Sequence, residues 1–417
     1  MDTEVLVYVD LEGEPAIVGR LWARRRKGRD SAAFEYDKGW LKRHDCFALE
    51  PALLLGPGPF YTLPGKPIFG AIGDSAPDRW GRMLMRRAER RRAERAGETP
   101  RTLREVDYLL MVNDEARQGA LRFALEPSGP FLAADDVAPI PPLVELPRLL
   151  SAAEKVAGDS ESDEDLRLLL APGSSLGGAR PKASVRDRDG ELAIAKLPHK
   201  DDEIDIVRWE AVALSLAGKA GIPVPDWRME EVGEKPTILL RRFDRASGHR
   251  VPFLSAMSML GANDSETRSY LEFVDALRQH GAAPKVDMHL LWRRMVFNVL
   301  ISNTDDHLRN HGFLYDGADG WRLAPAYDLN PVPVDIKPRV LATAIDLDDN
   351  TASLDLAVSV AEYFELEDTD ARKIAREVGR IVRGWRKEAE RVGLTSGQID
   401  RMASAFEHDD LRAALNF

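Results

Sequence analysis

The chain has 417 residues, more than a single hydrophobic core usually organises, so we expect two or three packed units. Hydrophobic residues make up 44% and charged residues 30%, which is typical of globular proteins and excludes a chain that is disordered throughout. The formal net charge of -11 gives no general attraction to nucleic acid or to anionic membranes. Cys46 is the single cysteine, which excludes an intrachain disulfide and a cysteine-built zinc site.

The amino terminus is acidic. Residues 1–14 carry Asp and Glu where a secretory signal needs a basic start and an apolar run. No window offers the roughly 18 uncharged apolar residues that a membrane-spanning helix requires. We therefore expect a cytoplasmic protein with no membrane partner.

The first part of the chain mixes strand and helix patterns. Residues 3–9 alternate apolar and polar side chains, and a second strand is expected near 17–22. Residues 77–95 have helical spacing and are rich in arginine with interspersed glutamate, which favours a solvated face over a nucleic-acid surface. Contact of this helix with DNA through a bound partner is the alternative. The proline-rich stretch 126–147 predicts a linker.

The second part opens with a hairpin. Residues 182–196 hold two short apolar runs around an Asp-Gly turn, and a helix is expected over 206–220. A strand at 237–241 follows. Beyond about residue 265 helical patterns dominate, with one hairpin at 312–325 and three helices over 352–416.

The sharpest chemical pattern is the pair Asp305 and Asn310, separated by four residues in a polar loop. This is the spacing of a kinase catalytic loop, in which a carboxylate orients the acceptor hydroxyl and an amide oxygen ligates magnesium. The hairpin that follows returns the chain, so Asp328 should come close to Asn310 and supply a second magnesium ligand. The alternative to a catalytic role is a structural one, in which Asp305 and Asn310 cap the end of a helix.

The expected phosphate-binding groups lie upstream. Residues 173–179 are rich in glycine and serine, so their backbone amides can approach an anion. Lys196 ends the second strand of the hairpin and can reach the phosphates, while Glu210 on the next helix can hold that lysine by an ion pair. The order of these pieces along the chain is that of a two-lobed kinase.

At this point the sequence resembles the HipA serine/threonine kinase toxins of bacterial toxin–antitoxin systems. The resemblance spans nearly the whole chain and rests on motifs at residues 73–81, 119–123, 177–182, 242–245, 304–310 and 325–328. It implies an α+β fold with a mixed α/β amino-terminal part and a mainly helical catalytic lobe. The expected parts are 1–125 (amino-terminal α/β domain), 126–147 (linker), 148–243 (small lobe with the glycine-rich loop) and 244–417 (catalytic lobe).

The resemblance implies the same roles for Asp305, Asn310, Asp328 and Lys196, with ATP and Mg²⁺ as cofactors. The residues expected to bind ATP are Gly177, Gly178, Ala179, Lys182, Lys196, Arg241, Phe243, His307 and Asn310. It also implies an inhibitory autophosphorylation at Ser175, with Ser174 as the neighbouring candidate. The implied partners are a HipB-like helix-turn-helix antitoxin, DNA only through that antitoxin, and a protein substrate such as a translation component.

Two other functions compete with this interpretation. One is a small-molecule phosphotransferase acting on an antibiotic or sugar, against which the long amino-terminal part argues. The other is a non-catalytic ATP-binding co-repressor, against which the intact Lys196, Asp305 and Asp328 argue. One departure from eukaryotic-type kinases concerns Asn303, which stands where those enzymes place a histidine, so another group must orient Asp305.

Overall fold

The computed structural model describes residues 2–133, 139–170, 178, 180–264, 266–317 and 320–417. Contacts within the chain divide it into two compact units. Unit 1 comprises residues 1–201 and 229–254, and unit 2 comprises residues 202–228 and 255–417. The two units interleave along the chain, and the boundaries expected at 125, 147 and 243 remain predictions.

The strands are β1 (Thr3–Leu11), β2 (Glu14–Arg26), β3 (Arg29–Tyr36), β4 (Phe60–Tyr61), β5 (Leu121–Ala124), β6 (Lys182–Arg186), β7 (Leu192–Lys196), β8 (Trp227–Val232), β9 (Lys235–Arg241), β10 (Arg245–Ala246), β11 (His249–Arg250), β12 (Phe253–Ser255), β13 (Gly312–Tyr315) and β14 (Trp321–Leu323). All but the last two lie in unit 1 or at its boundary with unit 2.

The helices of unit 1 are α1 (Gly70–Gly73), α2 (Arg79–Ala96), α3 (Glu105–Met111), α4 (Leu146–Ala157) and α5 (Asp163–Leu170). The helices of unit 2 are α6 (Ile206–Lys219), α7 (Ala256–Met259), α8 (Tyr270–His280), α9 (Pro284–Leu300), α10 (Leu354–Ser359), α11 (Asp368–Val382), α12 (Trp385–Arg391), α13 (Ser396–Arg401), α14 (Ala403–Phe406) and α15 (Asp409–Asn416).

The first sheet of unit 1 has five strands in the order β4-β3-β2-β1-β5. The predicted strands at 3–9 and 17–22 are confirmed as β1 and β2, which pair antiparallel. Their turn places Glu12 and Gly13 at positive φ, a conformation that glycine adopts at little cost. Strand β5 carries residues of the 119–123 motif and pairs with β1, so this motif is built into the edge of the sheet.

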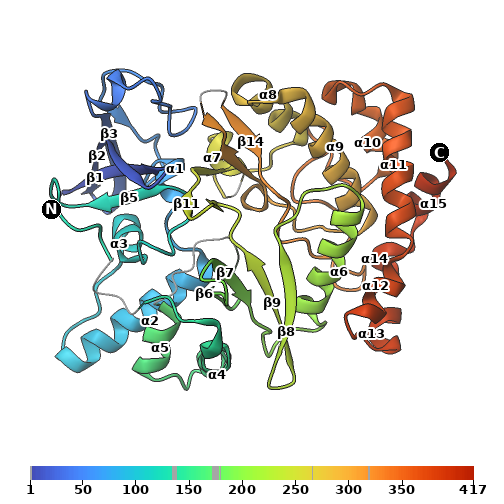
Figure 1. The fold of residues 1–417 in the computed structure, drawn as a ribbon, viewed down its shortest axis with the longest axis horizontal. Helices are drawn as coiled ribbons and strands as arrows, with labels where there is room; N and C mark the ends of the chain where they lie inside the picture. Colours follow the sequence, from blue (N-terminus) through green and yellow to red (C-terminus); the bar gives the residue numbers. More distant parts are fainter. Residues whose placement is uncertain (1, 134–138, 171–177, 179, 265, 318–319) are drawn as a thin grey trace. The chain divides into compact units, whose positions relative to one another are not determined.

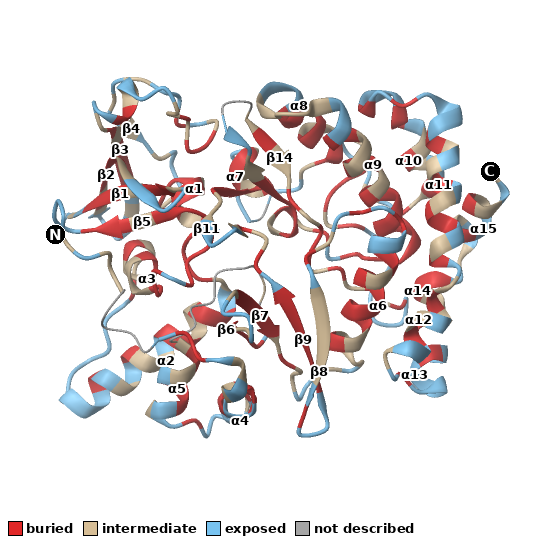
Figure 2. Ribbon diagram, viewed as in Figure 1, coloured by how far each residue is buried: buried red, intermediate tan, exposed pale blue. Residues whose placement is uncertain are grey.

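The second sheet of unit 1 has the order β6-β7-β9-β8. The predicted hairpin at 182–196 and the predicted strand at 237–241 are confirmed as β6–β7 and β9. Helices α2, α4 and α5 contribute to one apolar core with this sheet, and they lie beside it in Figure 1. Figure 2 shows β7 and β9 almost entirely buried, as expected for the centre of the sheet.

Helix α2 confirms the arginine-rich helix expected over 77–95. It begins after Asp78, whose side chain caps the helix by accepting from Gly81 N at 2.8 Å, and it ends at Gly97 in the left-handed conformation. Several of its arginines pair with acidic residues elsewhere in unit 1, for example Arg87 with Glu161 at 3.0 Å. In this pair Arg87 is 25% exposed and Glu161 only 6%, so part of the arginine-rich face packs against unit 1 and is not simply solvated.

Unit 2 is mainly helical. Helix α9 is buried over most of its length and packs on α8 and α11. The helix predicted over 206–220 is confirmed as α6, whose Trp209 lies 6.0 Å from the ring of Trp385. Trp385 stacks on Phe406 at 4.5 Å, so aromatic side chains join α6 to the carboxyl-terminal helices.

The carboxyl-terminal region differs from the expectation. The three helices predicted over 352–416 are wrong in number, because the structure has six, α10 to α15. Two of the breaks between these helices contain a residue at positive φ, Glu365 at 59° and Gly393 at 84°. Helical spacing of apolar residues continues across such short breaks, so periodicity alone does not reveal them. Within the described part of the chain, no helix is long and apolar enough to cross a bilayer.

Candidate active site

The loop between α9 and β13 carries Asp305 and Asn310. The Asn310 side chain donates from Nδ2 to the backbone oxygen of Asp305 at 2.7 Å. Asn310 Oδ1 is buried and has no hydrogen-bond partner among the described residues, whereas Asp305 is exposed. Because buried polar atoms are almost always satisfied, an unpaired amide oxygen suits a cation, and magnesium takes oxygen ligands. These two residues therefore fit the predicted magnesium site and acceptor-orienting carboxylate.

Asp328 is brought to the same loop by the hairpin β13–β14, which confirms the hairpin expected at 312–325. The Tyr327 hydroxyl donates to the backbone oxygen of Arg309 at 2.8 Å. This contact joins the residue before Asp328 to the residue before Asn310. Asp328 itself is half-buried and adopts a left-handed φ of 53°, a conformation that costs energy outside glycine and often marks a functional site.

Asp306 was not identified from the sequence, yet it anchors the loop. Its carboxylate is buried and accepts from the Tyr270 hydroxyl at 2.6 Å, from Ala342 N at 2.9 Å and from Thr343 N at 3.4 Å. Burial raises the pKa of Asp306 to about 7, while these hydrogen bonds act in the opposite direction. The second aspartate of the Asp-Asp pair is thus structural, and only the first is exposed.

Asn303 belongs to the same network. Its Nδ2 donates to Asn298 Oδ1 at 3.1 Å, and Asn298 Nδ2 donates to the Tyr270 hydroxyl at 3.0 Å. The Asn303 Oδ1 accepts from Asn330 N at 3.2 Å. Asn303 therefore ties the loop at residues 303–310 to α9 and to the segment that follows Asp328.

Two histidines in the loop have different surroundings. His307 is half-buried, and its backbone oxygen accepts from Asn310 N at 2.8 Å. His311 is buried against the rings of Tyr270 and Phe273, with centroids 5.6 and 5.2 Å away. Burial lowers the pKa of His311 to about 3, so this ring is neutral at physiological pH. The ATP contact expected of His307 remains a prediction.

The two lysines of the expected ATP site lie opposite each other on β6 and β7. Residues directly opposite in an antiparallel pair project from the same face, so Lys182 and Lys196 share one side of the sheet. A Cβ atom placed on Gly178 would lie 3.2 Å from Lys182 Nζ, which puts this ammonium beside the one described residue of the segment 173–179. Lys182 also forms an ion pair with Asp78 at 2.7 Å.

The other residues expected near ATP are spread over both units. Arg241 is exposed and pairs with Asp189 at 3.2 Å, and Phe243 lies 6.3 Å from the ring of Phe253. Glu210 is buried on α6 in unit 2, whereas Lys196 belongs to unit 1. Contact of Arg241 and Phe243 with ATP, and the ion pair of Glu210 with Lys196, remain predictions. The expected autophosphorylation and phosphate-contacting residues Ser174, Ser175, Gly177 and Ala179 lie outside the described residues.

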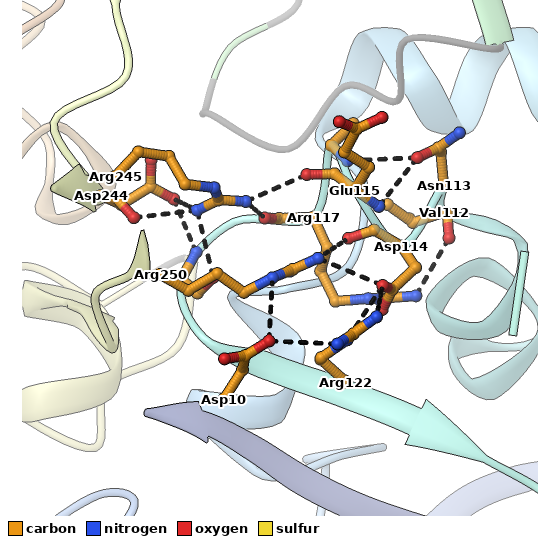
Figure 3. Close-up of polar contacts among 12 residues, drawn as sticks. Asp10, Val112, Asn113, Asp114, Glu115, Arg117, Arg122, Asp244, Arg245 and Arg250 are labelled. Carbon is orange, nitrogen blue, oxygen red and sulfur yellow. Dashed lines mark hydrogen bonds and ion pairs between the residues drawn. The ribbon is translucent and has the colours of Figure 1, made fainter. Parts of the chain in front are cut away.

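Two motifs of the resemblance meet in a buried ion cluster within unit 1 (Figure 3). Asp244 is almost fully buried and accepts from Gly119 N at 2.7 Å. The same carboxylate pairs with Arg242 and, at 3.0 Å, with Arg245. Burial lowers the pKa of Arg245 to about 9, although the neighbouring carboxylate opposes this shift.

The cluster continues toward the first sheet. Asp114 pairs with Arg122 at 2.6 Å and with Arg250 at 3.1 Å, as Figure 3 shows. The guanidinium of Arg117 is fully buried and donates to the backbone oxygens of Leu109 and Val112 at 2.9 and 3.0 Å. The contacts of Asp244 with Gly119 N and of Arg250 with Asp114 hold the segment after β9 against the segment that leads into β5.

Comparison with known families decides the identity. The HipA-like C-terminal domain family matches residues 174–385, about half of the chain. The chain belongs to the HipA-like family. The matched region contains Lys182, Lys196, Asp305, Asn310 and Asp328.

The HipA-like chain has relatives that are named as kinases. It is 27% identical over 326 residues to "Putative kinase Y4mE" of Sinorhizobium fredii, and the alignment covers 71% of each chain. It is 23% identical over 195 residues to a Haemophilus influenzae protein that is also named as a kinase. That alignment covers 41% of this chain and 57% of the relative.

A solved structure shows the same fold over almost the whole HipA-like chain. It is HipA of Shewanella oneidensis MR-1, determined in a toxin–antitoxin complex with HipB and operator DNA. The match covers 99% of this chain and 97% of that one, with a TM-score of 0.67 at 18% identity. At this identity the likeness concerns the fold, and it confirms the predicted α+β, kinase-like fold class.

Proposed function

We propose that this HipA-like chain is a serine/threonine protein kinase that transfers the γ-phosphoryl group of ATP to a protein hydroxyl with Mg²⁺. The observation that carries the proposal is the pairing of Asn310 with Asp305, which leaves Asn310 Oδ1 buried without a partner among the described residues. An exposed carboxylate beside an unsatisfied amide oxygen is what in-line phosphoryl transfer requires. The kinase names of two relatives support the same function.

Each residue has a defined task in this mechanism. Asp305 accepts a hydrogen bond from the acceptor hydroxyl and orients it toward the phosphorus. Asn310 and Asp328 would hold magnesium, which supplies positive charge to the phosphate oxygens. Lys196 and Lys182 bind the phosphates from the face of β6 and β7 that they share. Positioning and electrostatic stabilisation supply the acceleration, and no covalent intermediate with the protein is needed.

The proposal includes the regulation that the family resemblance implies. Phosphorylation of Ser175 or Ser174 would add charge to the glycine-rich segment and oppose ATP binding there. A HipB-like helix-turn-helix antitoxin is the proposed partner, with DNA bound through it, since the Shewanella HipA was solved with HipB and operator DNA. A translation component is the proposed class of protein substrate.

The substitution Asp305→Asn tests the function. It preserves the shape of the side chain but removes its charge, so transfer of radiolabelled phosphate from ATP to extract proteins should fall by about a hundredfold or more. Asp316→Asn is the matched control, because Asp316 is an exposed aspartate of the adjacent hairpin. The control should retain wild-type transfer.

Three outcomes would contradict the proposal. Near-normal transfer by Asp305→Asn would remove Asp305 from the mechanism. Transfer by the wild type to an aminoglycoside or a sugar, but not to protein, would identify a small-molecule phosphotransferase. ATP binding without any transfer would identify a non-catalytic co-repressor.

A further inference from the structure

The ion pair between Asp78 and Lys182 is unusual in its burial. The two charged atoms are 2.7 Å apart, and the side chains are only 3% and 6% exposed. Ion pairs with exposed side chains, such as Arg20 with Glu4, contribute little stability. Removing one member of a buried pair leaves an uncompensated charge in a medium that solvates it poorly. Asp78 therefore strongly restricts where the Lys182 ammonium can lie.

Asp78 is itself held in place. Its Oδ1 accepts from Gly81 N at 2.8 Å and caps α2, while its Oδ2 contacts Lys182. The preceding segment is fastened by two arginines, since Arg82 donates to Pro77 O at 2.9 Å and Arg117 donates to Ser75 O at 3.1 Å. The carboxylate thus projects from a capped helix start whose preceding backbone accepts from two arginine side chains.

The Lys182 ammonium also lies beside Gly178. A Cβ atom on Gly178 would come within 3.2 Å of Lys182 Nζ, and Gly178 has a φ of 101°, which only glycine adopts readily. Lys196 projects from the same face of the sheet, directly opposite in the register. Two ammonium groups on one face of the sheet, one of them beside Gly178, form a site suited to phosphate oxygens.

We propose that Asp78 is a positioning residue for the nucleotide, holding the Lys182 ammonium beside Gly178 where the phosphates of ATP bind. The inference rests on the proposed kinase function. It gives a role to the motif at residues 73–81, which lies outside the region matched by the family and which the catalytic assignment leaves unexplained. The amino-terminal part of unit 1 then contributes to the nucleotide site.

The substitution Asp78→Asn tests this role, because asparagine keeps an oxygen for capping α2 but removes the charge that holds Lys182. We expect the dissociation constant for a fluorescent ATP analogue to rise by about tenfold or more, as for the loss of a charge-assisted contact. Asp165→Asn is the matched control. Asp165 also combines a lysine partner, Lys155 at 2.9 Å, with a backbone contact at Ser162 N, but it lies on α5 and does not contact Lys182.

A double variant separates positioning from simple destabilisation. Lys182→Met should weaken nucleotide binding to at least the same degree, and adding Asp78→Asn should then weaken it no further. Thermal unfolding without nucleotide reports the structural cost, which both Asp78→Asn and Asp165→Asn should show. Of these two variants, Asp78→Asn alone should raise the dissociation constant of the nucleotide.

The outcomes distinguish the inference from the function on which it rests. Unchanged nucleotide binding by folded Asp78→Asn, with loss of stability alone, would show a purely structural ion pair. If Asp78→Asn does not fold, Lys182→Met decides, because unchanged nucleotide binding by that variant overturns the proposal. Failure of the wild-type chain to bind the ATP analogue would instead contradict the proposed kinase function.

Discussion

At the scale of single residues, burial raises the pKa of the Glu50 carboxyl. Glu50 is only 5% exposed and accepts from Ala71 N at 2.5 Å, at the start of α1. Burial raises the pKa of Glu50 from 4.5 to about 7. Between these two pH values the folded state holds a proton that the unfolded state has released. The free energy of unfolding therefore falls as the pH rises from about 4.5 to about 7, and it changes no further above that range.

The variant Glu50→Gln should remove this pH dependence, because glutamine keeps an acceptor for Ala71 N but does not titrate. Urea unfolding at pH 5 and pH 8 would measure the effect. From pH 5 to pH 8, the free energy of unfolding of the variant should rise by up to about 3 kcal/mol relative to that of the wild type. Glu14→Gln, at an exposed position, should show no such gain. An equal difference between Glu50→Gln and the wild type at both pH values would contradict the assignment.

At the scale of elements, the loop at residues 303–310 is held by its neighbours through side-chain hydrogen bonds. Asp306 connects the loop to Tyr270 at the start of α8 and to the backbone of residues 342 and 343. Asn303 connects it to α9 through Asn298. Helix α8 starts at a capping box in which Ser269 and Glu272 exchange hydrogen bonds, so Tyr270 is presented by a well-formed helix end.

The variant Tyr270→Phe should loosen the loop, because it removes a donor to Asp306 and an acceptor for Asn298 Nδ2 in a buried site. We expect a loss of about 1 to 3 kcal/mol in the free energy of unfolding. Because small displacements of reacting groups are costly, phosphoryl transfer should slow by about tenfold or more. Tyr363→Phe, at an exposed position of the same unit, is the control. Wild-type stability and transfer in Tyr270→Phe would show that the network does not hold the loop.

On the scale of the whole chain, the amino-terminal sheet and the kinase-like sheet belong to one unit, and buried charge helps to join them. Asp244, after β9, contacts Gly119 N just before β5, and its charge is balanced by Arg242 and Arg245. Each charge in this cluster needs an opposite charge beside it, because an isolated charge is costly to bury. The amino-terminal part is therefore expected to unfold together with the rest of unit 1.

The variant Asp244→Asn should strongly destabilise unit 1, because two buried guanidinium groups lose their shared counter-ion. Chemical unfolding should show a loss of about 3 to 5 kcal/mol. Asp189→Asn removes an aspartate from a surface pair with Arg241, in which both side chains are about half exposed, and should cost less than about 1 kcal/mol. Similar losses in the two variants would mean that the buried cluster contributes no more than a surface pair.

Local patterns were sufficient for most elements and for part of the site. Alternating residues predicted β1, and the Asp-Gly turn predicted the β6–β7 hairpin, because both depend on neighbours in sequence. Asp305 and Asn310 were found by their spacing, and the bond between them closes within that same loop. The six helices of the carboxyl-terminal region were miscounted, because apolar residues keep their helical spacing across the short breaks between them.

The sequence by itself determined the fold class, the family and the candidate residues Asp305, Asn310 and Asp328, since each depends on short motifs in a set order. Only the tertiary structure decided that Asp306 is buried beneath Tyr270 and that Asp78 pairs with Lys182. The physical reason is distance along the chain. Burial and ion pairing arise between segments that meet only after folding, and they alone determine whether a carboxylate faces solvent, a hydroxyl or an ammonium.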